Sequence, residues 1–228
     1  MSLLISSLLV AALLLLAIIA FERARPRPRD LMPVVVLATL AILGRVVMMP
    51  IPNFQPATAL IVLAGFFFGR NAGLLCGMLV AFMSNVFLGQ GPWTPWQMLA
   101  WGLVGYGAGI LGTFFQQKSA PAVSSQPDAE PSTSLKNRMF TPAHFVYSLI
   151  VIVYGTLVSL LFGMIMDLQF FIAYAWEAGW SGLLATWAMG LPLNIAHAAS
   201  TLIFLALTLI PWGKKLQRLK TKYGIQPV

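Results

Sequence analysis

Long apolar runs, separated by short polar or Pro-rich stretches, repeat along the whole chain. Most of these runs are close in length to a membrane-spanning helix, which needs about 20 residues to cross the hydrocarbon core of a bilayer. The pattern predicts seven membrane-spanning helices, of which the third is short. The seventh is so long that we expect Pro192 to kink or break it, or its start to project from the membrane. The predicted spans are residues 2–20, 31–49, 57–69, 72–88, 96–115, 142–166 and 180–210.

The segments between the runs divide the chain into units. One connector is basic and holds two Pro, which cannot continue a helix. Another is rich in Ser, Pro and charge, as flexible tethers are. Glycines spaced four apart, at Gly73 and Gly77 and again at Gly105 and Gly109, predict close helix packing. The predicted units are an N-terminal helix with its basic connector (1–30), the first part of the bundle (31–115), a flexible cytoplasmic loop (116–141), the last two spans (142–212) and a basic tail (213–228).

Composition agrees with this pattern and excludes a soluble protein. Hydrophobic residues make up 59% of the chain and charged residues 9%, whereas about 25% of a soluble domain is charged. The chain is therefore predicted to be an all-α integral membrane protein. Its single cysteine, Cys76, lies in the middle of an apolar run, so no disulfide can form within the chain.

The net charge of +8 is gathered in the stretches between the runs. With the N-terminus outside and the C-terminus in the cytoplasm, every Lys and Arg except Arg45 falls on the cytoplasmic side, as the positive-inside rule requires. This distribution argues against nucleic acid as a partner. No Lys or Arg precedes the first run and four Arg follow it, so we expect a retained span and not a cleaved signal peptide.

The outer side of this arrangement collects Pro, Trp and amide residues. Residues 85–101, around the turn between the fourth and fifth runs, hold three Trp and three side-chain amides. Two explanations are open: an aromatic belt at the bilayer surface with amides that join helices, or the rim of a pocket that binds a solute. The turn 50–56 (PIPNFQP) and the connector 167–180 (DLQFFIAYAWEAGW) lie on the same side.

Arg45 lies near the outer end of the second run. Either it extends to the bilayer surface as an anchor, or it belongs to a site and its partner is Asp167, Glu177 or a polar group of a ligand. Asn53 and Gln55 either cap helix ends or contact the ligand. The candidate binding residues are Arg45, Asn53, Gln55, Asn85, Gln90, Trp93, Thr94, Gln97, Trp176 and Trp180.

Covalent chemistry and metal binding find little support. Asn194 and His197 lie one turn apart, where hydrogen bonds between helices explain them better than a metal, which would need about four ligands. Residues 179–182 (GWSG) match the GxSG pattern of rhomboid-type intramembrane proteases. However, the step from Ser181 to His197 is about 24 Å of helix, too far for a catalytic pair. We expect neither enzyme activity nor a metal or cofactor.

Two stretches, 52–85 (PNFQPATALIVLAGFFFGRNAGLLCGMLVAFMSN) and 87–109 (FLGQGPWTPWQMLAWGLVGYGAG), resemble the substrate-binding S-component family of energy-coupling factor (ECF) transporters. They are most similar to its cobalamin-type members. The resemblance implies a bacterial cell-membrane protein that binds a vitamin at its outer face. A membrane coupling protein and two cytosolic ATPases then help to pass the vitamin inward. The chain has no phosphate-binding G-x-x-x-x-G-K-[ST] motif of its own, which agrees with energy supplied by such partners.

On this resemblance, the fold is a six-helix bundle and residues 2–20 are one extra N-terminal transmembrane helix. The family's first core helix often carries an AxxxA motif that docks on the coupling protein; Ala38, Ala41 and Gly44 are the corresponding small residues here. The expected solute is cobalamin, although riboflavin, a queuosine precursor or another planar heterocycle would also suit Trp and amide side chains. A structural membrane subunit without a pocket is the remaining alternative.

Overall fold

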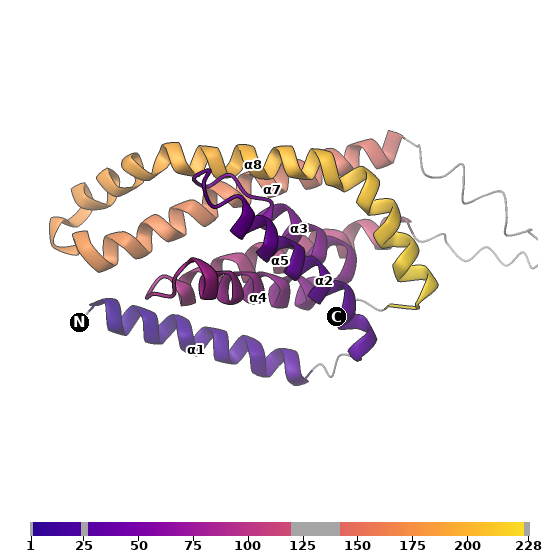
Figure 1. Cartoon of the computed structure of the whole chain (residues 1–228), viewed down its shortest axis with the longest axis horizontal. Coiled ribbons are helices and arrows are strands. Elements are labelled where there is room, and N and C mark those ends of the chain that lie inside the picture. The colour runs from indigo at the N-terminus through magenta and orange to yellow at the C-terminus, as the bar shows by residue number, and fades with distance from the viewer. Residues whose placement is uncertain (1, 24–26, 120–141, 226–228) are drawn as a thin grey trace, which may run out of the picture.

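The computed structural model describes residues 2–23, 27–119 and 142–225, and over these residues it contains helices and no strand. The all-α fold predicted from the sequence is confirmed. A π-helical turn (Phe171–Ala175) and a 3-10 turn (Trp176–Ala178) join the last two helices. The α-helices, shown in Figure 1, are α1 (Ser2–Arg23), α2 (Pro28–Val47), α3 (Ala57–Phe68), α4 (Arg70–Leu88), α5 (Thr94–Ser119), α7 (Pro142–Phe170) and α8 (Gly179–Lys222).

Helices of membrane-spanning length dominate the fold. Within the described residues, four helical stretches are long and apolar enough to cross a bilayer, which is the pattern of a multi-pass membrane protein. They are Pro28–Val47, Arg70–Leu88, Thr94–Phe115 and Val146–Leu209. The last of them covers most of α7 and the first part of α8, which fold back on each other as a hairpin (Figure 1). Helix α1 lies along the edge of the bundle, where Val10 and Leu14 pack against Met78 of α4.

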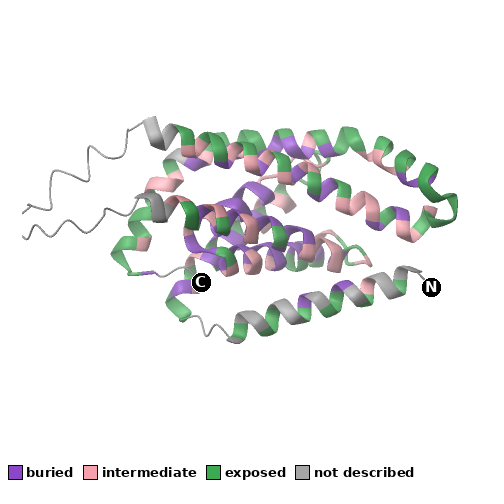
Figure 2. Ribbon diagram, turned by 180° about the vertical axis from the view of Figure 1, so that it is seen from behind, coloured by how far each residue is buried: buried purple, intermediate pink, exposed green. Residues whose placement is uncertain are grey.

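Helix α3 lies at the centre of the bundle and contacts α2, α4, α5 and α8. It is apolar on every side, as a fully buried helix is, and all its residues except Phe66 and Phe67 are buried (Figure 2). Its 12 residues make about 18 Å of helix, well short of the about 30 Å hydrocarbon core. Helix α3 alone is therefore shorter than a complete span. In the loop of residues 48–56 before it, residues 49–52 are exposed and residues 53–56 are partly buried.

Helices α4 and α5 approach each other most closely through their glycines. A Cβ atom at Gly73 would overlap the backbone of Gly105, and a Cβ at Gly105 would overlap that of Gly73. A Cβ at Gly77 would likewise overlap the backbone of Trp101. The predicted small-residue seam is confirmed. It fixes the face of α5 that carries Gln97 and Trp101 against α4.

The α7–α8 hairpin is longer than the rest of the bundle. The 29 residues of α7 and the 44 of α8 make about 44 and 66 Å of ideal helix, compared with about 29 Å for the 19 residues of α4. Helix α8 is unbroken at Pro192, and the tip of the hairpin projects beyond the α4–α5 turn (Figure 1). Of the alternatives for the last span, a break at Pro192 is therefore excluded. Within the predicted connector 167–180, α7 ends at Phe170 and α8 begins at Gly179, and the two helical turns between them join the helices.

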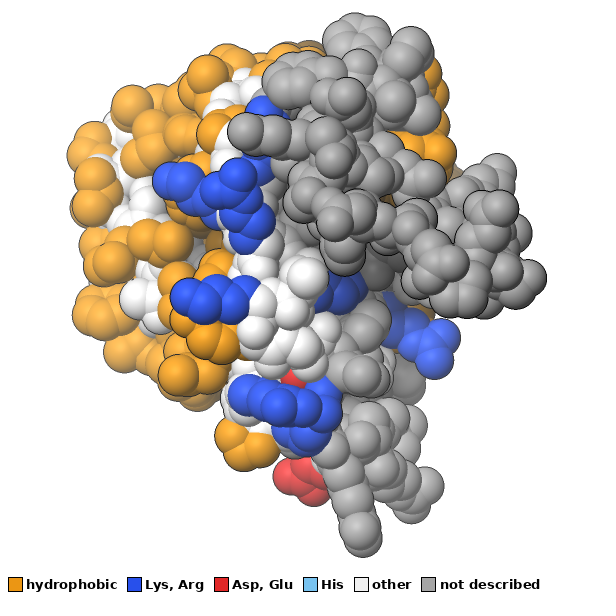
Figure 3. All heavy atoms as spheres, turned by 90° about the vertical axis from the view of Figure 1, so that its right-hand side faces the viewer, with side chains coloured by type: hydrophobic (Ala, Val, Ile, Leu, Met, Phe, Trp, Pro, Cys, Tyr) orange, Lys and Arg blue, Asp and Glu red, His pale blue; other side chains and the backbone are white. Residues whose placement is uncertain are grey.

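At the other end of the bundle, α8 continues through Pro211 to Lys222, so most of the predicted basic tail is helical. The Lys220 ammonium donates to the Phe67 carbonyl at 3.1 Å, which holds this part of α8 against the end of α3. Figure 3 looks onto this end, where Lys and Arg side chains gather. The exposed ones include Arg27, Arg29, Arg70, Lys215 and Arg218. Most of the predicted loop 116–141 lies outside the described residues, and its first four residues continue α5.

The small residues predicted to dock a partner helix face inward instead. Ala38 and Ala41 of α2 are buried in the core, and a Cβ at Gly44 would overlap the Pro56 ring. Their size lets α2 pack closely against its own α3 and α4. The prediction that Ala38, Ala41 and Gly44 form a partner-docking surface is therefore wrong in this structure.

Candidate functional site

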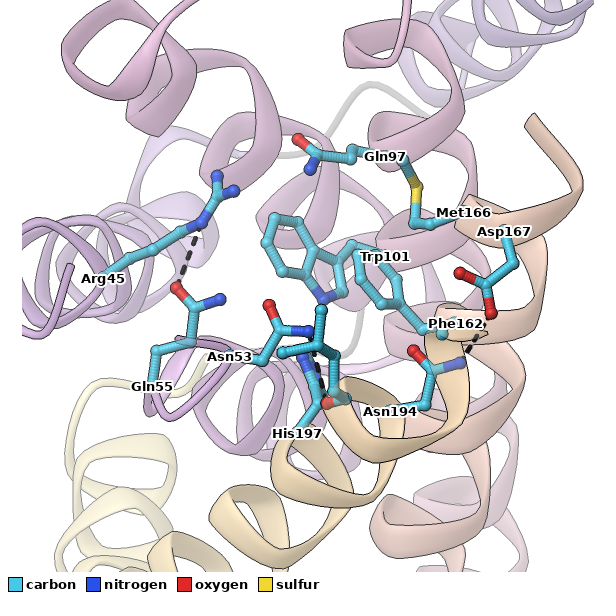
Figure 4. Close-up of a pocket in the computed structure, with 13 residues that line it drawn as sticks. Arg45, Asn53, Gln55, Gln97, Trp101, Phe162, Met166, Asp167, Asn194 and His197 are labelled. Carbon is cyan, nitrogen blue, oxygen red and sulfur yellow. Dashed lines mark hydrogen bonds between the residues drawn. The ribbon is translucent and has the colours of Figure 1, made fainter. Parts of the chain in front are cut away.

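A partly open cavity of about 170 Å³ lies among α2, the 48–56 loop, α5, α7 and α8 (Figure 4). Its wall is mixed: one cation, one acid, four side-chain amides, a histidine and two aromatic rings. The residues that line it are Arg45, Asn53, Gln55, Gln97, Trp101, Phe162, Gly163, Met166, Asp167, Gly190, Leu193, Asn194 and His197.

The Arg45 guanidinium is held by neutral groups only. Its Nε donates to Oε1 of Gln55 at 3.1 Å, and its Nη1 donates to Oδ1 of Asn85 at 2.9 Å and to the Ser84 hydroxyl. A guanidinium has five N–H donors, and the two on Nη2 have no hydrogen-bond partner among the described residues. No carboxylate in the described part of the chain pairs with Arg45. The prediction of Asp167 or Glu177 as its partner within the chain is wrong.

A chain of polar groups behind Arg45 fixes the end of the α4–α5 turn. The Asn85 amide donates to Oε1 of Gln97 at 2.7 Å and to the Thr94 hydroxyl at 2.9 Å. Thr94 in turn donates to Oε1 of Gln90 at 2.8 Å. Asn85 and Thr94 are buried, so these hydrogen bonds satisfy groups that would otherwise be costly to bury. Asn85, Gln90 and Thr94 therefore position Arg45 and Gln97 and do not line the cavity.

The 48–56 loop forms the side of the cavity nearest α8 and is hydrogen-bonded to that helix. Asn53, with a φ of 53°, donates from its side chain to the Leu193 carbonyl at 3.2 Å. The Ser200 hydroxyl accepts from the backbone N–H of Gln55 at 2.8 Å and donates to the Gln55 carbonyl at 2.9 Å. Neither Asn53 nor Gln55 caps α3, whose N-cap is Pro56 without a side-chain hydrogen bond. The capping alternative is excluded.

Aromatic rings form the apolar part of the wall. The Trp101 ring stacks on Phe162, with centroids 4.6 Å apart and an interplanar angle of 15°, and the Arg45 guanidinium carbon lies 4.8 Å from the Trp101 ring centroid. Phe162 also stacks on His197 at 5.2 Å. Figure 4 shows Trp101 and Phe162 between Arg45 on one side and Asp167 on the other.

Thr58 of α3 links two of these rings. Nε1 of Trp101 donates to the Thr58 hydroxyl at 3.0 Å, and that hydroxyl lies 2.7 Å from Nε2 of His197. Because an indole N–H can only donate, the Thr58 hydroxyl accepts it and has its own hydrogen left for Nε2 of His197. The predicted role of His197 in hydrogen bonding between helices is confirmed.

Asp167 lies across the cavity from Arg45 and is held by α8. The Asn194 amide donates to Oδ2 of Asp167 at 2.7 Å, while Oδ1 has no hydrogen-bond partner among the described residues. Two glycines make room for this pair: a Cβ at Gly163 would overlap the Asn194 amide, and a Cβ at Gly190 would overlap the Asp167 carboxylate. The close α7–α8 crossing thus brings an acid into a wall that is otherwise neutral or basic.

The structure brings together only part of the predicted site. Arg45, Asn53, Gln55 and Gln97 line the cavity, whereas Trp93, Trp176 and Trp180 do not. Trp176 and Trp180 lie at the projecting tip of the hairpin, with exposed fractions of 59% and 80%, because α7 continues past Asp167 and carries them away.

Several lining residues were missed from the sequence. Trp101 follows Gln97 by four residues, so helical periodicity could have placed both on one face. Asn194, one turn before His197, was predicted to make a hydrogen bond between helices, and its place in the cavity wall was not predicted. Phe162 is one of many apolar residues in its run, and no sequence signal distinguishes it.

The two residues of the GxSG candidate, Ser181 and His197, are hydrogen-bonded to different groups. The Ser181 hydroxyl donates to the Ala178 carbonyl at 2.8 Å, and His197 is bonded to Thr58. No three His, Cys, Asp or Glu side chains in this part of the chain come close enough to hold a metal ion. What the cavity offers is hydrogen bonding, charge and apolar contact.

Comparisons with known proteins identify a family for this chain but no individual relative. No curated protein and no solved structure matches the chain. One family model matches residues 5–212, a range that contains all the residues lining the cavity and most of α1, and its description is a family of unknown function (DUF6580). The chain therefore belongs to the DUF6580 family.

Proposed function

We propose that this protein is a membrane-embedded solute-binding protein that captures a small molecule in the Arg45–Asp167 cavity, as the S-component of an ECF-type importer does. The observation that carries the proposal is the cavity itself. Polar side chains from four helices and a loop converge on one partly open volume inside an otherwise apolar bundle. Ionisable residues within a membrane bundle are costly and usually mark substrate pathways or binding sites.

The partly paired guanidinium of Arg45 also favours a binding site. A charged group within a bundle is costly unless it is paired or solvated. Arg45 is partly buried, and the two free N–H groups of its Nη2 lie at a partly open cavity, where water or a ligand can accept their hydrogen bonds. A ligand that accepts these hydrogen bonds would supply the missing partner.

The short helix α3 supports the same function. Irregular backbone at membrane depth is tolerated where it is enclosed by protein or lines a cavity. The 48–56 loop meets this condition, since it is tied to the middle of α8 at Leu193 and Ser200 and exposes Asn53 and Gln55 to the cavity. In membrane transporters, such interruptions of helices commonly form the substrate site.

The size of the cavity bears on the solute. Sites for drug-sized ligands measure about 300–1,000 Å³, and this cavity measures about 170 Å³. Cobalamin, expected from the sequence resemblance, is larger than a drug-sized ligand and would require the bundle to open. The geometry favours a smaller molecule, such as a single planar heterocycle.

We further propose how the protein lies in the membrane and with which partners it works. Helix α1 is an extra helix beside a six-helix bundle in a bacterial cell membrane. The N-terminus lies outside and the C-terminus in the cytoplasm. A membrane coupling protein and two cytosolic ATPases supply the energy. The partner surface is not the Ala38, Ala41 and Gly44 face of α2, which is buried.

Thermal unfolding of the purified protein in detergent, with and without cyanocobalamin, riboflavin or smaller vitamins, tests solute binding. A ligand at 100 times its Kd adds about 2.7 kcal/mol to the free energy of unfolding, which raises the unfolding midpoint measurably. We expect at least one of the smaller heterocycles to do so. If no vitamin shifts the midpoint, the solute-binding proposal fails and a structural subunit is favoured.

A further inference from the structure

We infer that the ligand of the Arg45–Asp167 cavity is amphoteric: a small ring-sized molecule with a carboxylate at one end and an N–H donor at the other. This inference rests on the proposed solute-binding function and names the chemical class of the solute. It follows from which polar groups in the cavity wall are already paired and which are not.

The anionic end of the ligand is assigned to Arg45. Both N–H groups of Nη2 are free, while Nε and Nη1 are held by Gln55, Ser84 and Asn85. These bonds fix the plane of the guanidinium, so its free edge has a defined direction. Arginine binds planar anions such as carboxylates with well-oriented, charge-assisted hydrogen bonds. No carboxylate within the described residues occupies that role.

The donor end of the ligand is assigned to Asp167. One carboxylate oxygen, Oδ2, already accepts from Asn194, and Oδ1 remains without a hydrogen bond among the described residues. A carboxylate only accepts hydrogen bonds, so the complementary ligand group is an amine or another N–H. Gly190 and Gly163 keep the space around this pair free of side chains.

The body of the ligand lies between the two ends. Arg45 and Asp167 occupy opposite sides of the cavity, with Trp101 and Phe162 between them (Figure 4). These rings offer apolar contact along the path, and Gln97 lines the cavity beside them. A neutral acceptor would leave the charge of Arg45 uncompensated, and a molecule with anions at both ends would be repelled by Asp167. Only a ligand with an acceptor and a donor at opposite ends satisfies both sides.

Three matched probes separate these requirements: 4-aminobenzoate has both groups, benzoate lacks the donor, and 4-aminobenzamide lacks the negative charge. Their affinities can be measured by equilibrium dialysis with the full chain in lipid nanodiscs at pH 7. Hydrogen bonds to charged groups contribute about 1.5–3 kcal/mol, so we expect 4-aminobenzoate to bind about tenfold or more tightly than either of the others. Equal binding of benzoate or 4-aminobenzamide, or no binding of any probe, would overturn the inference.

Variants assign each end of the probe to its residue. Asp167→Asn should remove most of the preference for 4-aminobenzoate over benzoate and leave benzoate affinity unchanged. Arg45→Gln should remove the preference for 4-aminobenzoate over 4-aminobenzamide. The matched controls Glu177→Gln and Arg70→Gln change the same charges at exposed positions outside the cavity and should change neither preference. An unchanged preference in Asp167→Asn contradicts the assignment even if Arg45→Gln does not fold.

The inference and the proposed function fail in different ways. If a vitamin raises the unfolding midpoint but the three probes do not follow the expected order, solute binding stands and the amphoteric class is wrong. If neither the vitamins nor the probes bind, both are wrong.

Discussion

Thr58 shows how single residues of the buried α3 hold the cavity wall in place. It is fully buried, accepts a hydrogen bond from Trp101 and lies within hydrogen-bond distance of His197. Three helices, α3, α5 and α8, are thereby joined at one hydroxyl. The Trp101 and His197 rings cannot turn without breaking this link, which gives the cavity a defined shape.

We expect Thr58→Val to destabilise the protein by about 2 kcal/mol or more. Valine keeps the shape of threonine but leaves the Trp101 N–H and His197 Nε2 unpaired, and each unpaired buried group costs about 1–3 kcal/mol. The free energy of unfolding in detergent, measured by denaturant titration, checks this. Thr39→Val is the matched control, because the exposed Thr39 hydroxyl donates only to the Val35 carbonyl of its own helix. Equal effects of the two substitutions would contradict the proposed role of Thr58.

At this scale the sequence predicted the polar part of the cavity better than the apolar part. Arg45, Asn53, Gln55 and Gln97 stand out because polar side chains in or beside apolar runs need partners. Phe162 lies among many apolar residues in a run, and its contact with Trp101 depends on which faces of α5 and α7 meet. That is a property of packing, not of the residue type.

Among the helices, the glycine seam between α4 and α5 sets the position of the cavity. Because Gly73 and Gly105 bring the two backbones into contact, the hydrogen-bonded group of Asn85, Thr94 and Gln97 can bridge the end of this pair. The seam was predicted from its spacing of four residues, since small residues at that interval share one helix face.

We expect Gly105→Ala to destabilise the protein by about 1–3 kcal/mol or more, as overpacking does. The added Cβ would meet backbone atoms of Gly73, which cannot move aside without separating the helices. Gly102→Ala is the control one turn away, because its Cβ would meet the end of the Leu74 side chain at 2.9 Å and Cγ of Met78 at 3.4 Å, while the nearest backbone atom, the Leu74 carbonyl oxygen, is 3.6 Å away. There the about 1 kcal/mol gain in helix propensity offsets a small adjustment. Thermal unfolding of both variants checks the difference, and a more stable Gly105→Ala would contradict the seam.

Sequence reasoning located two elements without their conformation or length. Residues 167–180 are predicted as a connector because they mix acids with aromatic residues, and they contain no Pro and no Gly before Gly179 to end a helix. Helical turns therefore continue from α7 to Ala178. The composition of α3 is that of a span, and its length of 12 residues is seen only in the structure.

For the whole molecule, the distribution of charge defines two different ends. Lys and Arg residues gather at the end where α8 terminates (Figure 3), and the hairpin tip at the other end carries Glu177 and no Lys or Arg. The positive-inside rule then places the basic end in the cytoplasm. This orientation is a prediction, and cysteine labelling tests it directly.

Glu177→Cys should react with a membrane-impermeant maleimide in intact cells, and Lys215→Cys should react only after the membrane is permeabilised. Both positions are exposed. The native chain is its own control, because its single cysteine, Cys76, is fully buried and should stay unlabelled. Labelling in the reverse order would place the N-terminus in the cytoplasm and would contradict the proposed topology.

The central claim, that the Arg45–Asp167 cavity binds a small solute, is tested most directly by calorimetric titration of the full chain with the vitamin that most raises its unfolding midpoint. We predict one saturable site per chain, weakened about tenfold or more in Gln97→Ala, which removes a lining amide. Gln217→Ala removes an amide at an exposed position of α8 outside the cavity and should bind as the native chain does. Absence of saturable heat, or equal binding by all three proteins, would contradict the claim.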